Sequence, residues 1–219
     1  PTQQCLPIIR ELLQREEDAD DVYQPLLLWW ALETHCTKSP EDVLELFAAT
    51  ELWGEPLVQQ HITHRLMQRF AATGKRSDLL VCSQLMDQAP SEEDQKRLLR
   101  GFEEAFAGRS LAGLPQKLIE QINDLGGGSL ALRVRGGDKE ALTTALKTIA
   151  DAKADAKLRS DLVRVFAEVK SEQAIGPLIA LASKDKNAEL RIQALASLQV
   201  YESPQISDAA VELVKREDL

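Results

Sequence analysis

Two pairs of residues in this chain have side chains that could bind a metal ion or act in catalysis. His61 and His64 are three positions apart, so on a helix both rings can face one metal ion. Two ligands do not complete a metal site, and no cysteine or carboxylate cluster has the spacing to supply the others. We therefore predict no metal site and interpret both histidines as surface or groove residues.

His35 and Cys36 form the second pair, the types used in cysteine nucleophiles. Neighbouring side chains on a helix point about 100° apart, and the sequence offers no third group to orient the histidine. Gly126-Gly127-Gly128-Ser129 has the glycines of a phosphate loop without its Gly-Lys-Ser/Thr ending. We predict no catalytic residue and no cofactor.

Trp29 and Trp30 are the most unusual residues of the chain. They follow Pro25, which suits the first turn of a helix, and they belong to a segment that is apolar almost all round. Adjacent side chains cannot share one direction, so we expect at least one indole in the core. The other could line a groove, because tryptophan is favoured at binding hot spots. Trp29 and Trp30 are therefore the candidate partner-binding residues.

The elements that position these residues show a helical spacing of apolar side chains. It is clearest from Ala174 to Leu198, where two apolar stripes flank a polar turn at residues 183–187. Two short amphipathic helices cannot bury their apolar faces alone, so they require neighbours of the same kind. Ser39, Ser77 and Ser91 are expected to cap the starts of three further helices.

Pro177, Asp185 and Arg191 resemble the proline, aspartate and arginine positions of HEAT repeats. In that family the aspartate and arginine link neighbouring repeats by hydrogen bonds in the turns. A shift of the sequence by 32 positions places Arg159 on Arg191, although Ala145 falls on Pro177. The resemblance implies an all-α fold, an α-solenoid of antiparallel helix pairs of the HEAT or armadillo kind. Pro177, Asp185, Arg191 and Arg159 are then structural repeat positions.

Glycine spacing divides the chain into three expected segments. Residues 1–107 contain helix-pair repeats, residues 108–137 form a glycine-rich helical junction, and residues 138–219 contain the HEAT-like repeats. The chain does not begin with methionine, and its last segment resembles a first repeat helix without its partner. We therefore expect a fragment of a longer protein.

A second resemblance rests on YQPLLLWWALE near the start and LPQKLIEQINDLGGGSLALRVRGGDKEAL in the middle. Both are similar to the helical-repeat region of large exported planctomycete-type proteins related to membrane-bound dehydrogenases, which carry a β-propeller and a c-type haem domain. This resemblance implies an exported or periplasmic parent protein. The haem attachment motif C-x-x-C-H is absent from this chain, so no haem or dehydrogenase role is assigned to its residues.

Composition narrows the function further. A net charge of −9 over 219 residues opposes binding to nucleic acid, which needs a concentrated basic surface. No apolar run approaches the ~18 residues of a membrane helix, so direct membrane insertion is not expected. We expect a non-catalytic scaffold that binds a protein or spaces domains. The alternative is an enzyme similar to the HEAT-like DNA glycosylases, which would need clustered lysine and arginine on inner helices.

Overall fold

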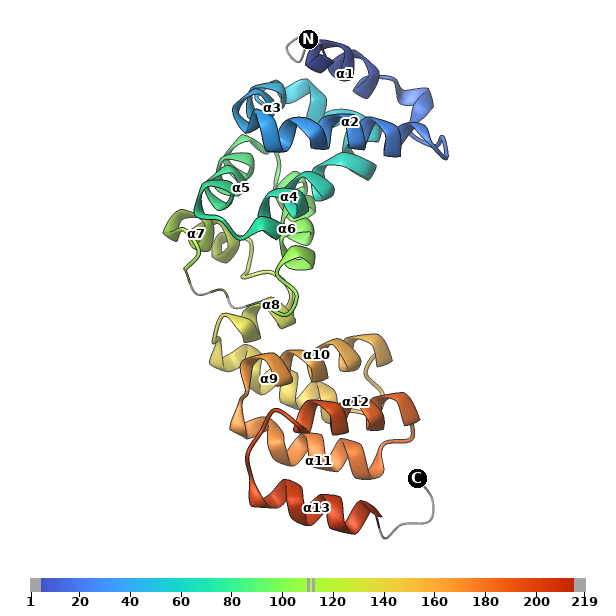
Figure 1. The fold of residues 1–219 in the computed structure, drawn as a ribbon, viewed down its shortest axis with the longest axis vertical. Coiled ribbons are helices and arrows are strands. Elements are labelled where there is room, and N and C mark those ends of the chain that lie inside the picture. Colours follow the sequence, from blue (N-terminus) through green and yellow to red (C-terminus); the bar gives the residue numbers. More distant parts are fainter. Residues whose placement is uncertain (1–4, 110, 112, 215–219) are drawn as a thin grey trace. The chain divides into compact units, whose positions relative to one another are not determined.

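The protein is all-helical in the computed structural model, which describes residues 5–109, 111 and 113–214. Within these ranges there is no β-strand, which confirms the prediction of an all-α chain (Figure 1). The remaining positions lie outside the described residues. They include the start of the expected segment 1–107, two positions of the expected junction 108–137 and the end of the expected segment 138–219. No helix in the described part is long and apolar enough to cross a membrane.

The helices form two compact units. The first comprises the described residues within 1–107 and 112–128, and the second those within 108–111 and 129–219. The glycine-rich segment 108–137 is therefore divided between the units. Gly126 and Gly127, both with positive φ, end a helix, and their N–H groups donate to the carbonyls of Asn123 and Ile122.

The first unit contains seven α-helices and three short 3₁₀ or π turns among its described residues. The turns are Glu16–Asp18, Thr50–Gly54 and Val58–Ile62. The α-helices are α1 (Cys5–Leu13), α2 (Gln24–Lys38), α3 (Pro40–Phe47), α4 (Thr63–Thr73), α5 (Arg76–Gln88), α6 (Glu92–Ala105) and α7 (Gln116–Asp124).

Two of the three expected helix starts lie where the sequence places them. Ser91 precedes α6 and its hydroxyl accepts from the Asp94 N–H, so this cap is confirmed. Ser39 precedes α3, where Pro40 occupies the first position, but its side chain makes no capping bond. The expected cap at Ser77 is wrong, because α5 already begins at Arg76 and the Ser77 hydroxyl instead donates to Asp78.

The core of the first unit lies where α4 and α6 pack side by side (Figure 1). Gly101 of α6 faces the backbone of α4 so closely that a methyl group there would lie 1.9 Å from the His64 carbonyl oxygen. Elsewhere in the first unit, Trp53 is buried edge-on against Phe47 and donates its indole N–H to the Phe47 carbonyl at 2.8 Å. The tight crossing fixes α4 against α6.

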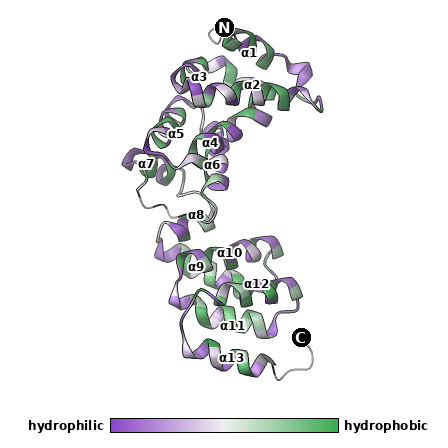
Figure 2. Ribbon diagram, viewed as in Figure 1, coloured by the Kyte–Doolittle hydropathy of each residue, from purple (hydrophilic) through white to green (hydrophobic). Residues whose placement is uncertain are grey.

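The second unit contains α8 (Leu130–Arg135), α9 (Lys139–Ala150), α10 (Ala156–Val169), α11 (Ile175–Lys184), α12 (Ala188–Leu198) and α13 (Pro204–Val214). Side chains cap four of these helices, from Ser129, Asp138, Asp155 and Asn187. Apolar residues recur every three to four positions along these helices and form one face on each. The apolar faces meet in one core (Figure 2).

Helices α10 and α12 run side by side in the same direction. The Ser160 hydroxyl donates to Gln193 at 2.7 Å, the Ser197 hydroxyl to the Val163 carbonyl at 3.2 Å, and the Tyr201 hydroxyl to the Phe166 carbonyl at 2.5 Å. The paired positions increase together along α10 and along α12 with the residues that follow it, since Tyr201 lies just after α12, and the separations are 33, 34 and 35 residues. Helix α11 connects them and packs on α12.

Candidate functional site

The two tryptophans of α2 lie in different surroundings. Trp29 is 8% exposed and packs into the first unit, whereas Trp30 is 55% exposed. Leu26 and Leu27 of the same helix are also partly open to solvent. Because α2 is apolar almost all round as far as Leu32 and only part of that surface packs on neighbours, an aromatic surface remains at Trp30.

An open groove of about 370 Å³ lies beside this indole. Helix α2 contributes one wall and α4 the other, while α6 adds a single small residue, Ala105. The lining residues, here called the Trp30 groove, are Leu26, Trp29, Trp30, Glu33, Arg65, Gln68, Arg69, Ala72 and Ala105. The groove therefore combines an exposed indole, short alanine side chains and two guanidinium groups.

The two arginines of the groove differ in their partners. Arg69 lies 3.1 Å from the Glu33 carboxylate and donates at 2.7 Å to the Thr37 hydroxyl. The Arg65 Nη1 atom is buried and has no hydrogen-bond partner among the described residues. An unsatisfied buried donor costs free energy, so Arg65 is the member of the groove that stands to gain from a new acceptor.

His61 and His64 do not form part of a metal site within the described residues. His61 lies with Nε2 2.9 Å from the Ala19 carbonyl oxygen. Burial, together with the charges of Arg65 and Arg100, lowers the pKa of His64 below its usual value, although Glu104 opposes the shift. No group of three or more histidine, cysteine or acidic residues in the described part could hold a metal ion.

His35 and Cys36 are both buried. His35 Nδ1 has no hydrogen-bond partner within the described residues, and the Cys36 thiol donates to the Leu32 carbonyl at 3.6 Å. Burial raises the pKa of Cys36 to about 12. Reactive cysteines instead have lowered pKa values and partial exposure, so Cys36 has the properties of a structural residue.

The structure brings three of the four expected repeat positions together at one turn. Arg159 is 4% exposed, and its guanidinium donates to the Ile149 carbonyl at 2.9 and 3.1 Å and to the Asp185 carboxylate at 2.5 Å. Arg191 donates to the Asp185 carbonyl at 3.1 Å. Asp185 thus connects the turn after α11 to the helix starts of α10 and α12. Pro177 lies in the first turn of α11, about 12 Å along the helix from this turn.

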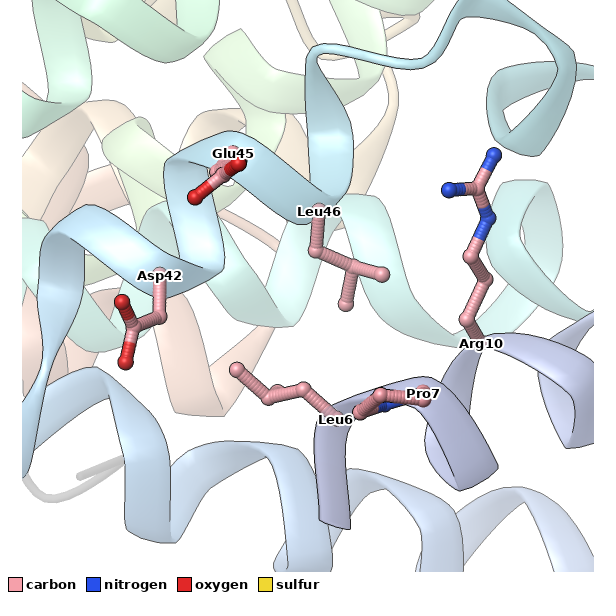
Figure 3. Close-up of a pocket in the computed structure, with 6 residues that line it drawn as sticks. All are labelled: Leu6, Pro7, Arg10, Asp42, Glu45 and Leu46. Atoms are coloured by element: carbon pink, nitrogen blue, oxygen red, sulfur yellow. The ribbon is translucent and has the colours of Figure 1, made fainter. Parts of the chain in front are cut away.

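A second hollow, of about 380 Å³, lies between α1 and α3 (Figure 3). Leu6, Pro7 and Arg10 come from α1, while Asp42, Glu45 and Leu46 come from α3. The side chains of Arg10, Asp42 and Glu45 are exposed, so water can satisfy all three charges. Among the described residues that line it, this hollow has no buried group without a hydrogen-bond partner, so the Trp30 groove is the better candidate.

Sequence reasoning selected the tryptophans but missed the groove residues outside α2, which are Arg65, Gln68, Arg69, Ala72 and Ala105. These residues lie on α4 and α6, and only tertiary packing places them beside α2. Arg65 and Arg69 are four positions apart, which indicates a shared helix face, but nothing local connects that face to Trp30. Comparison with protein families, curated proteins and solved structures finds no match to this chain.

Proposed function

We propose that this chain is a non-catalytic α-solenoid scaffold that binds a protein partner through the Trp30 groove. The observation that carries the proposal is the 55% exposure of Trp30 beside an open, partly apolar groove. A large indole left in water is energetically unfavourable, and tryptophan is among the residues most enriched at interface hot spots.

The packing of the second unit supports the solenoid part of the proposal. Helices α10 and α12 run in the same direction with a separation of 33 to 35 residues, close to the 32-position self-similarity of the sequence. Helical-repeat arrays in general stack units of roughly 20–45 residues, and such arrays expose long surfaces for protein binding. In this proposal the Arg159–Asp185 pair holds successive repeats together.

The proposal extends to the parent protein. From the resemblance to planctomycete-type dehydrogenase and haem-domain proteins, we propose that the scaffold belongs to a larger exported chain, where it would dock a partner or another domain. The net charge of −9 supports a protein rather than a nucleic acid as the ligand.

Photocrosslinking from residue 30 tests the proposal. The parent protein would carry benzoylphenylalanine in place of Trp30, and irradiation in its native cells should give a defined covalent adduct with one protein. The control places the same group at Ile192, which is 66% exposed on α12 outside the groove. No protein adduct at residue 30, or the same adducts at both positions, would contradict the proposal.

A further inference from the structure

The Trp30 groove has the size to hold side chains rather than a whole helix. Its volume of about 370 Å³ lies near the lower end of the roughly 300–1,000 Å³ typical of small-ligand sites. Leu26, Ala72 and Ala105 offer apolar surface, and the exposed face of the Trp30 indole offers more. One bulky apolar side chain would fill this part of the groove and remove Trp30 from water.

The charge of the groove opposes that of the chain. Two arginines and one glutamate line it, which gives a net charge of +1, whereas the whole chain carries −9. Glu33 is already paired with Arg69. Arg65 therefore provides the local positive charge that is not neutralised by a carboxylate of the groove lining, and complementary charge would favour an anionic group.

Arg65 also identifies the anionic group that fits best. Its buried Nη1 lacks a hydrogen-bond partner among the described residues, and a guanidinium forms strong paired hydrogen bonds with a carboxylate or a phosphate. The net charge of −9 opposes binding to nucleic acid phosphates, so a protein carboxylate is favoured. Because Nη1 is covered, a ligand would reach it after a rotation about the terminal bonds of the side chain. A carboxylate next to a bulky apolar side chain would satisfy Arg65 and cover Trp30 together.

We infer that the Trp30 groove binds an acidic-apolar segment of a partner protein, in which an aspartate or glutamate lies beside a leucine, isoleucine or aromatic residue. The apolar side chain packs against Trp30 and the carboxylate pairs with Arg65. This inference rests on the proposed function and adds the chemistry of the partner. Nucleic acid phosphate and a second copy of this chain are the competing occupants.

Selection from a peptide library tests the inference. The probe is a phage-displayed library of random peptides of about twelve residues, a length that covers common peptide-recognition modes. The complete chain is the target, with Trp30→Ala and Arg65→Met as variants whose fold is verified by circular dichroism. Leu27→Ala is the matched control, because Leu27 is 53% exposed on α2 but does not line the groove.

The expected result is enrichment of peptides with an acidic residue next to a bulky apolar one. The dissociation constants of these peptides should rise about tenfold or more for Trp30→Ala and change little for Leu27→Ala. Changing the peptide glutamate to glutamine should weaken binding to the wild-type protein by a similar factor. The glutamine exchange keeps the test valid even if Arg65→Met does not fold.

Three results would overturn the inference. These are enrichment of basic or uncharged peptides, equal binding to wild type and Trp30→Ala, and no enrichment at all. Concentration-dependent dimerisation that Trp30→Ala abolishes would assign the groove to a second copy. Salt-sensitive DNA binding that Trp30→Ala abolishes would assign the groove to nucleic acid. If photocrosslinking at residue 30 still captures a protein, the scaffold function stands while the acidic-apolar chemistry is wrong.

Discussion

Arg159 and Asp185 form the most deeply buried ion pair among the described residues, with side-chain exposures of 5% and 8%. A buried pair does not add much stability compared with apolar residues of similar size, but losing one partner leaves a charge uncompensated. Arg159 also satisfies the Ile149 carbonyl, so its guanidinium is fixed by three bonds. The pair should therefore tolerate replacement poorly.

Arg159→Met should lower the free energy of unfolding by about 3–5 kcal/mol, because Asp185 and the Ile149 carbonyl would lose their partner. Denaturant unfolding followed by circular dichroism measures this change. Lys96→Met is the control, since Lys96 pairs with Glu92 and Glu93 in solvent, and its unfolding midpoint should not move. Equal effects of both changes would show that the Arg159–Asp185 pair is not important for the fold.

The same pair predicts how stability responds to acid. Burial raises the pKa of Asp185. The Arg159 hydrogen bond, the Asn187 N–H and the charges of Arg159 and Arg191 together lower it by more, so the pKa lies below its ordinary value. A lowered folded pKa stabilises the protein above the unfolded value of about 3.9, and this stabilisation is lost as pH falls through the folded pKa.

Asp185→Asn should therefore lose stability relative to wild type at neutral pH, and the difference should narrow below about pH 4. Urea unfolding between about pH 3 and pH 7 compares the two proteins over this range. Stability curves that stay parallel down to the acid limit would mean that Asp185 does not have a lowered pKa in the folded protein.

Residue types predicted part of this picture. Asp185 and Arg191 were selected by their resemblance to the aspartate and arginine positions of HEAT repeats. Both take part in the contacts of the turn after α11. The burial of Trp29 rather than Trp30 could not be predicted, because both lie on a helix that is apolar almost all round. Arg65 carries no local signal either, since its missing partner is a property of the packed neighbours.

At the scale of elements, the contact between α4 and α6 depends on a single glycine. Gly101 has no room for a side chain, whereas a methyl group added at Gly54, the last residue of the 3₁₀ turn Thr50–Gly54, would meet no atom beyond its chain neighbours within 4 Å. The two glycines therefore have opposite reasons for their small size. One allows close packing, and the other only adds flexibility to the unfolded chain.

Gly101→Ala should cost more than about 3 kcal/mol, above the usual ~1–3 kcal/mol of overpacking, because its methyl group would meet backbone that cannot rotate away. Gly54→Ala should raise stability by about 0.4–1 kcal/mol by restricting the unfolded state, because Gly54 has no positive φ. Thermal unfolding of the two variants distinguishes these cases. A well-folded Gly101→Ala protein of normal stability would contradict the close α4–α6 crossing.

Helices were easier to predict than their assembly, because a period of 3.6 residues is encoded locally. The apolar stripes of residues 174–198 and the cap at Ser91 illustrate this. The start of α5 was misplaced, since Ser77 can bond to the adjacent Asp78 instead of capping. The groove between α2 and α4 depends on long-range packing, which apolar spacing alone does not specify.

At the scale of the whole chain, the helices belong to two compact units with separate cores. Phe166 is fully buried in the second unit, so Phe166→Ala should remove about 3–5 kcal/mol from that unit. Amide hydrogen exchange should become faster in α9 to α12 and remain unchanged in α4 and α6. Uniform acceleration across both units would indicate one cooperative unit instead.

A calorimetric titration of the 219-residue chain with the partner crosslinked at residue 30 measures whether Trp30 binds a protein. Wild type, Trp30→Ala and Leu27→Ala would be compared under the same conditions. The affinity of Trp30→Ala should fall about tenfold or more, while Leu27→Ala should bind like wild type. Equal affinities for wild type and Trp30→Ala would contradict the proposed binding through Trp30.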